Sequence, residues 1–172
     1  MLGILALGCA IREPSPEPPI SAKQKFAVEF IKSLEDYRSY SYLCPGGRWS
    51  IGYGTGSYGW ILPYGPNGKT EIPGERNISR VQAEKRMVAY LHANVWNKVP
   101  KTLNMAQYAV YASLEYNLGG NKAKVFINKQ GSMNCSKILT YRKVKDKKND
   151  GIIKRRKEEY NLCLKTTLQQ SY

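Results

Sequence analysis

The first regular pattern in the chain is a run of apolar residues at helical spacing, which begins shortly after residue 20. They recur three or four positions apart and so share one face of a helix: Phe26, Phe30, Ile31 and Leu34. Ser21 followed by Gln24 is a capping-box pattern, in which two side chains satisfy the free N–H groups at a helix start. The pattern predicts a helix that turns this face toward a core and ends at Glu35.

The next pattern is alternation, which is typical of a strand. The turn signal PGG at 45–47 precedes WSIGY at 49–53, in which apolar and polar positions alternate. Glycines interleaved with aromatic residues follow, and YGPNG at 64–68 is a second turn signal. Residues from about 49 to 75 are therefore predicted to form a small antiparallel sheet with loops.

The remainder of the chain returns to helical patterns. Ser79 with Gln82 is a second capping box and predicts a helix to about residue 97. One face of that helix is expected to carry Val81, Val88, Leu91 and Val95. Asn104 is the next cap signal, for a helix through Asn117 that is closed by two glycines at 119–120. Three further helical segments are expected at about 121–129, 134–144 and 151–168.

These elements predict an α+β chain with a small antiparallel-sheet lobe at about 49–75 and a mainly helical lobe at about 79–168, joined by a long helix. We expect the folded domain to span residues 21–172 and to be preceded by a separate segment, 1–20. Its first ten residues are apolar and too few to span a bilayer, which takes about 20. They are interpreted either as an export or anchor remnant or as a plain packing segment, and 12–19 as a proline-rich spacer.

The charge of the chain indicates an anionic partner. There are 27 Lys and Arg residues against 13 Asp and Glu residues, a formal net charge of +14. Nucleic acid, an acidic membrane and an anionic cell wall all meet this requirement. The base-dense run at 137–157 is most simply a solvated helix face. No nucleic-acid recognition motif occurs, so we expect no nucleic-acid partner.

The cysteine and histidine inventory limits the chemistry. Cys9, Cys44, Cys135 and Cys163 are scattered and form no CxxC pair, which argues against a disulfide framework or a zinc site. His92 is the only histidine, which excludes histidine-based triads and multi-histidine metal sites. We therefore expect no metal and no cofactor.

Three protic side chains follow one another across the predicted helix, turn and strand. Glu35 ends the helix, Cys44 lies in the turn and Ser50 lies on the strand, so one cleft can hold all three. Partial desolvation beside the apolar stripe favours a carboxylic acid that keeps its proton, as a general acid must. The plain interpretation is a helix-end carboxylate, a buried thiol and a turn hydroxyl without a shared function.

The spacing resembles that of the phage-type lysozymes, the endolysin muramidases of glycoside hydrolase family 24. Their pattern is a helix ending in Glu, then Arg, Tyr, Asp or Cys, and Thr, followed by IGYG. The corresponding positions here are Glu35, Arg38, Tyr42, Cys44, Ser50 and IGYG at 51–54. The blocks at 106–119 and 151–159 also resemble family segments, and the likeness covers about residues 22–165.

The resemblance implies a lysozyme-like fold and a muramidase that hydrolyses the β-1,4 bond between N-acetylmuramic acid and N-acetylglucosamine. It implies that Glu35 is the general acid, and that Cys44 and Ser50 place the attacking water or stabilise the sugar cation. The substrate-binding residues that it implies are Tyr42, Tyr53 and Asn117. Arg38, Arg155 or Arg156 is a candidate for activating the Cys44 thiol, and a disulfide from Cys44 to Cys9 or another cysteine would silence it.

The implied partner is peptidoglycan, and the implied role is bacterial host lysis by a monomer. The enzyme is expected to be exported to the periplasm or cell wall, or released from the host cytoplasm by phage lysis. The charge of +14 would aid adhesion to an anionic cell-wall or outer-membrane surface. The alternative is a catalytically inactive lysozyme-like protein that binds glycan or disrupts membranes through its basic C-terminal region.

Overall fold

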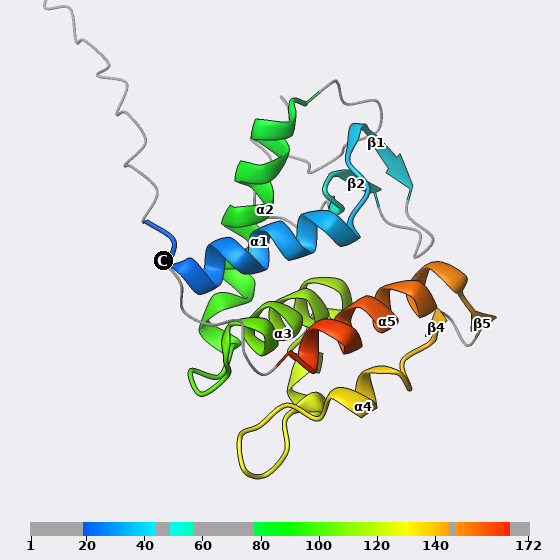
Figure 1. The fold of residues 1–172 in the computed structure, drawn as a ribbon. Helices are drawn as coiled ribbons and strands as arrows, with labels where there is room; N and C mark the ends of the chain where they lie inside the picture. The colour runs from blue at the N-terminus through cyan, green and yellow to red at the C-terminus, as the bar shows by residue number, and fades with distance from the viewer. Residues whose placement is uncertain (1–18, 44–48, 57–77, 145–146, 166–172) are drawn as a thin grey trace, which may run out of the picture.

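A computed structural model describes residues 19–43, 49–56, 78–144 and 147–165 of the chain. Within these ranges a three-stranded antiparallel sheet lies beside a larger group of helices, which confirms the predicted α+β class. Figure 1 shows the sheet next to the C-terminal end of α1 and to α2, and the other helices grouped around α3. No helix of the described ranges is long and apolar enough to cross a membrane, and the apolar segment 1–10 lies outside them.

Helix α1 spans Ala22–Leu34, and the predicted capping box between Ser21 and Gln24 is present in full. Its buried face agrees with the predicted one at Ile31 and differs at the other three positions. The fully buried residues are small or branched: Ala27, Val28 and Ile31. The predicted Phe26, Phe30 and Leu34 are only half-buried. Small side chains on the buried face let α1 pack closely against α3, while the larger residues flank the contact.

The sheet has the order β1-β2-β3, with β1 at Arg38–Leu43, β2 at Trp49–Gly52 and β3 at Thr55–Gly56. Tyr42 pairs with Ser50, and the register is irregular between Arg38 and Tyr42. Strand β2 confirms the prediction, but β1 was missed, so the predicted start of the sheet at about residue 49 is wrong. The segment RSYSYL carries mostly polar and aromatic side chains, and its pairing with β2 makes it a strand. The predicted loops at 57–75 lie outside the described residues.

Helix α2 spans Arg80–Asn94 and is followed by the 3-10 helix η1 at Trp96–Lys98. The Ser79 capping box is confirmed. Of the predicted apolar face, Leu91 and Val95 are buried, but Val81 is 65% exposed. Ala83 and Met87 take its place in the core, because the helix turns the Ala83–Met87–Leu91 row inward.

Helix α3, at Met105–Leu118, is the centre of the helical lobe. Its predicted cap Asn104 accepts a hydrogen bond from the Gln107 N–H, and it ends at Gly119 with φ of 64°. Residues 109–115 are all buried, because α1 and α5 both pack against this helix. Side chains of α3 therefore reach elements that lie far apart in the sequence.

The C-terminal part is less helical than predicted. It contains η2 at Lys122–Phe126, the one-turn helix α4 at Cys135–Ile138, a hairpin of β4 (Lys143–Val144) and β5 (Lys147–Lys148), and α5 at Asp150–Cys163. The predicted helix at 134–144 thus ends early, and α5 ends before 168. A disulfide joins Cys135 on α4 to Cys163 on α5, which corrects the expectation of no disulfide framework. The two cysteines are 28 residues apart, and only the packing of α4 on α5 brings them together.

Candidate active site

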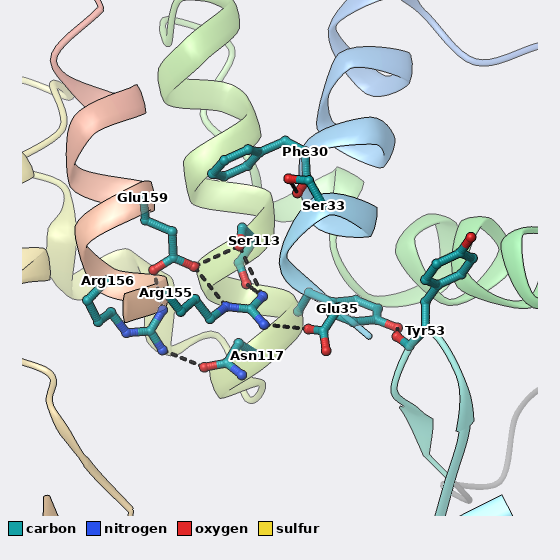
Figure 2. Close-up of polar contacts among 10 residues, drawn as sticks. Phe30, Ser33, Glu35, Tyr53, Ser113, Asn117, Arg155, Arg156 and Glu159 are labelled. Carbon is teal, nitrogen blue, oxygen red and sulfur yellow. Dashed lines mark hydrogen bonds and ion pairs between the residues drawn. The ribbon is translucent and has the colours of Figure 1, made fainter. Parts of the chain in front are cut away.

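Glu35 lies at the point where the chain leaves α1. It is the C-cap residue, its N–H donates to the Ile31 carbonyl at 3.0 Å, and its extended backbone ends the helix. Its side chain is 18% exposed and points toward α5. Arg155 donates from Nη1 to Glu35 Oε1 at 2.5 Å, and Figure 2 shows this contact between the ends of the two side chains. The predicted general acid therefore has a buried arginine as its partner.

Arg155 is fixed by contacts with two further residues. Its Nε donates to Glu159 Oε1 at 3.1 Å, and its Nη2 donates to the Ser113 hydroxyl at 3.1 Å. Burial alone would lower the pKa of the Arg155 guanidinium, but the carboxylates of Glu35 and Glu159 outweigh burial and raise that pKa above its usual value. The guanidinium therefore stays charged and keeps one orientation toward Glu35.

A fully buried carboxylate anchors this network inside the helical lobe. Glu159 has no exposed surface and accepts hydrogen bonds from Arg155, from the Ser113 hydroxyl at 2.7 Å and from Arg156. Arg156 also donates to the amide oxygen of Asn117. The expectation of a solvated basic face at 137–157 is therefore wrong for Arg155 and Arg156, since both are buried and paired with carboxylates.

The sheet lobe approaches Glu35 from the other side. Gly54 has a φ of 76°, and a Cβ atom at this position would lie 3.0 Å from Glu35 Oε2. The same point is 4.0 Å from the hydroxyl of Tyr42. The glycine thus supplies both the left-handed backbone of the turn and the space for the carboxylate. Glu35 lies between this turn and Arg155.

The other predicted site residues differ in their placement. Ser50 is buried on β2 and pairs with Tyr42 on β1, whose ring lies under the Arg38 guanidinium at 4.4 Å. Tyr53 is only 5% exposed and packs against Tyr37, and its carbonyl accepts a hydrogen bond from the Tyr116 hydroxyl. Cys44 lies outside the described residues, as does Cys9.

Sequence reasoning did not identify several residues of this network. Ser113, Tyr116 and Glu159 were unassigned, and Arg155 was considered only as a partner of the Cys44 thiol. The four-residue spacing of Arg155 and Glu159 on a helix is a local signal for an ion pair. No local signal connects Arg155 to Glu35, which is 120 residues away.

The arrangement suits acid catalysis by a carboxyl group. A partly exposed carboxyl group beside a fixed guanidinium can deliver a proton, and the guanidinium stabilises the carboxylate that remains. Among the described residues there is no group of three or more His, Cys, Asp or Glu side chains that could hold a metal ion.

Comparison with solved structures identifies the fold. The endolysin of Escherichia coli O157:H7 phage FAHEc1 matches with a TM-score of 0.61 at 22% identity, covering 90% of this chain and 99% of that chain. The muramidase domain of SpmX from Asticaccaulis excentricus matches with a TM-score of 0.56 at 21% identity, covering 80% and 94%. The active form of the P1 phage endolysin Lyz matches with a TM-score of 0.56 at 17% identity, covering 86% and 87%. These similarities confirm the expected lysozyme-like fold.

Sequence comparison identifies the family. No curated protein sequence matches the chain. The family model described as phage lysozyme matches residues 32–159, which run from the end of α1 into α5 and include both Glu35 and Arg155. This match covers most of the chain, and the chain belongs to the phage lysozyme family.

Proposed function

We propose that Glu35 is the general acid of this chain and that it protonates the β-1,4 glycosidic oxygen between N-acetylmuramic acid and N-acetylglucosamine. As a phage lysozyme, the chain is a peptidoglycan-degrading muramidase and a glycoside hydrolase. The observation that carries the role of Glu35 is its place between Arg155 and the Gly54 turn, with 18% of its side chain open to solvent.

The surroundings of Arg155 support this role. When Glu35 gives up its proton it becomes negative, and the guanidinium 2.5 Å away stabilises that developing charge. Arg155 also has Glu159 as a second, fully buried counter-ion. The charge of Arg155 is therefore balanced by Glu159 whether or not Glu35 carries a proton.

The second face of the sugar needs a group that orients water or stabilises the oxocarbenium ion. We assign this role to Cys44 and Ser50, with Tyr42, Tyr53 and Asn117 contributing to substrate binding. The pairing of Tyr42 with Ser50 supports the assignment, because the Tyr42 hydroxyl lies close to the Gly54 turn beside Glu35. Cys44→Asp is expected to keep activity and Cys44→Ala to lose most of it.

The proposed setting is the bacterial cell wall, which the enzyme reaches by export or by host lysis. The formal charge of +14 favours adhesion to anionic wall polymers or to the outer-membrane surface, and a monomer is sufficient for the reaction. Lysis of the host then follows from loss of the glycan strands.

The deciding experiment measures reducing ends and muropeptides released from purified peptidoglycan. Glu35→Gln keeps the shape of the side chain and removes its proton-donating group, so we expect the rate to fall about 10²- to 10⁴-fold. Glu29→Gln is the matched control, because Glu29 lies exposed on the same helix and pairs with Lys32 at 3.0 Å. We expect it to leave the rate unchanged.

Two outcomes would contradict the proposal. If Glu35→Gln releases reducing ends at the wild-type rate, Glu35 is not the acid. If the wild-type protein kills bacteria and releases no reducing ends, the inactive, membrane-disrupting alternative replaces the enzymatic one.

A further inference from the structure

Helix α3 contacts both groups that flank Glu35. Ser113 and Tyr116 are three residues apart and so share one helical face. The Ser113 hydroxyl accepts from Arg155 Nη2 at 3.1 Å, and the Tyr116 hydroxyl donates to the Tyr53 carbonyl at 2.6 Å. Neighbouring residues of α3 therefore hold Arg155 on one side of Glu35 and the β2–β3 turn on the other. Figure 2 shows Ser113, Arg155, Glu35 and Tyr53 in this arrangement.

The Tyr116 hydroxyl keeps its proton and so remains a hydrogen-bond donor. Burial raises its pKa well above the usual tyrosine value, and the negative charge of Glu35 raises it further. The hydroxyl therefore stays protonated throughout the neutral range. Tyr90 contacts the Tyr116 ring edge-to-face, with the ring centroids 5.3 Å apart, which fixes the direction of the hydroxyl.

The turn that Tyr116 contacts is closed by hydrogen bonds between β2 and β3. Ile51 and Thr55 are partners in the β2–β3 ladder, and the Thr55 hydroxyl also donates to the Ile51 carbonyl at 2.9 Å. Gly54 lies within this closed turn, one residue after the carbonyl that Tyr116 binds, and directly faces Glu35 Oε2. A hydrogen bond at Tyr53 thus fixes the distance between the turn and the carboxyl group.

We infer that Tyr116 is a positioning residue, whose hydroxyl holds the β2–β3 turn against the Glu35 carboxyl group and so keeps the acid between that turn and Arg155. The inference rests on the proposed role of Glu35 as the acid. It assigns a part in the reaction to a side chain that does not itself exchange a proton with the substrate.

The first test removes only the hydroxyl. Tyr116→Phe keeps the ring and its contact with Tyr90, so we expect kcat on soluble peptidoglycan fragments to fall about tenfold while KM stays within about twofold. Tyr108→Phe is the matched control, because Tyr108 lies on the same helix and its ring stacks on Trp96 at 5.9 Å. We expect the control to keep the wild-type kcat.

The second test combines Tyr116→Phe with Gly54→Ala. Alone, Gly54→Ala should lower kcat, because the added methyl group meets Glu35 Oε2 at 3.0 Å on a left-handed backbone. Without the hydrogen bond from Tyr116, the turn can move away from the Glu35 carboxyl group. The loss of kcat in the double variant should therefore be smaller than the product of the two single losses. Strictly multiplicative losses, or a wild-type kcat in Tyr116→Phe, would overturn the inference.

Amide hydrogen exchange separates failure of this inference from failure of the proposed function. In Tyr116→Phe we expect the amide hydrogens of residues 53–55 to exchange at least about tenfold faster, with unchanged exchange in the Tyr108→Phe control. Unchanged exchange at 53–55 would overturn the inference that Tyr116 holds the turn, whatever the activity of the variant. If exchange at 53–55 rises in Tyr116→Phe but Glu35→Gln is fully active, Tyr116 does hold the turn. In that case the proposed role of Glu35 fails instead.

Discussion

Glu115 and Glu159 in the helical lobe and Glu35 at the end of α1 are all partly or fully buried carboxyl groups, but their surroundings differ. Glu159 accepts from Arg155, Arg156 and the Ser113 hydroxyl, and it is completely buried. Glu115 is 1% exposed and accepts from Lys98 Nζ at 3.0 Å and from the backbone N–H groups of Asn121 and Ala123.

Glu35 differs from these two groups because its side chain reaches the solvent. Its side chain is 18% exposed, and its Oε1 accepts a hydrogen bond from Arg155. Its second oxygen faces the Gly54 turn. A buried carboxyl group enclosed by hydrogen-bond donors stabilises the fold, whereas a carboxyl group that reaches the solvent is accessible to a substrate. Exposure therefore distinguishes the two buried carboxyl groups from Glu35, the proposed acid.

The largest effect on stability is expected at Glu159. Glu159→Gln leaves Arg155 and Arg156 buried without their shared counter-ion, so the free energy of unfolding should fall by about 3–5 kcal/mol. Chemical denaturation measures this change. Glu158→Gln is the control, because Glu158 is the exposed neighbour on α5 and should change stability by less than about 0.5 kcal/mol. Equal effects at the two positions would remove the structural role of Glu159.

The second largest effect is expected at the disulfide, which also holds α5 in place. Replacing Cys135 by Ser and Cys163 by Ala together opens the disulfide, whose partners are 28 residues apart, and should lower the free energy of unfolding by about 2–4 kcal/mol. A thiol reductant should destabilise the wild-type protein and leave the double variant unaffected. If the variant matches the wild type in denaturant, the ion network alone keeps α5 in position.

A smaller loss is expected at Glu115. Glu115→Gln removes the charge opposite Lys98 and replaces one accepting oxygen with an NH₂ group, so one buried donor loses its partner, at a cost of about 1–3 kcal/mol. Lys98→Met removes the ion pair alone. It should cost less, because the Lys98 side chain is 30% exposed and the backbone hydrogen bonds remain. The reverse order would mean that the ion pair, not the backbone contacts, gives Glu115 its importance.

The smallest change in stability is expected at Glu35, the proposed acid. Glu35→Gln should leave the thermal transition nearly unchanged or slightly higher, because Arg155 retains Glu159 and active-site carboxyl groups are often kept at a cost in stability. Differential scanning calorimetry on the variant used for the activity test measures this. A drop as large as that of Glu159→Gln would place Glu35 with the structural carboxylates.

Sequence patterns predicted correctly where helices begin. They did not predict which strands pair or which helix faces are buried. The caps at Ser21, Ser79 and Asn104 are confirmed, because capping depends on residues three positions apart. Strand β1 was missed, since its residues become a strand only through pairing with β2. The buried face of α2 was misplaced at Val81 because hydrophobicity alone does not say which row meets the core.

The sequence by itself determined the α+β class, the position of Glu35 at a helix end and, through its spacing to IGYG, the family resemblance. These features depend on residues that lie close together in the sequence. Tertiary structure alone decided the partners of Glu35. Arg155 is 120 residues away and Tyr116 contacts a carbonyl 63 residues away, and both contacts exist because α3 packs between α1 and α5. The Cys135–Cys163 disulfide was decided in the same way, because a cysteine pair is defined by distance in space rather than by spacing in the chain.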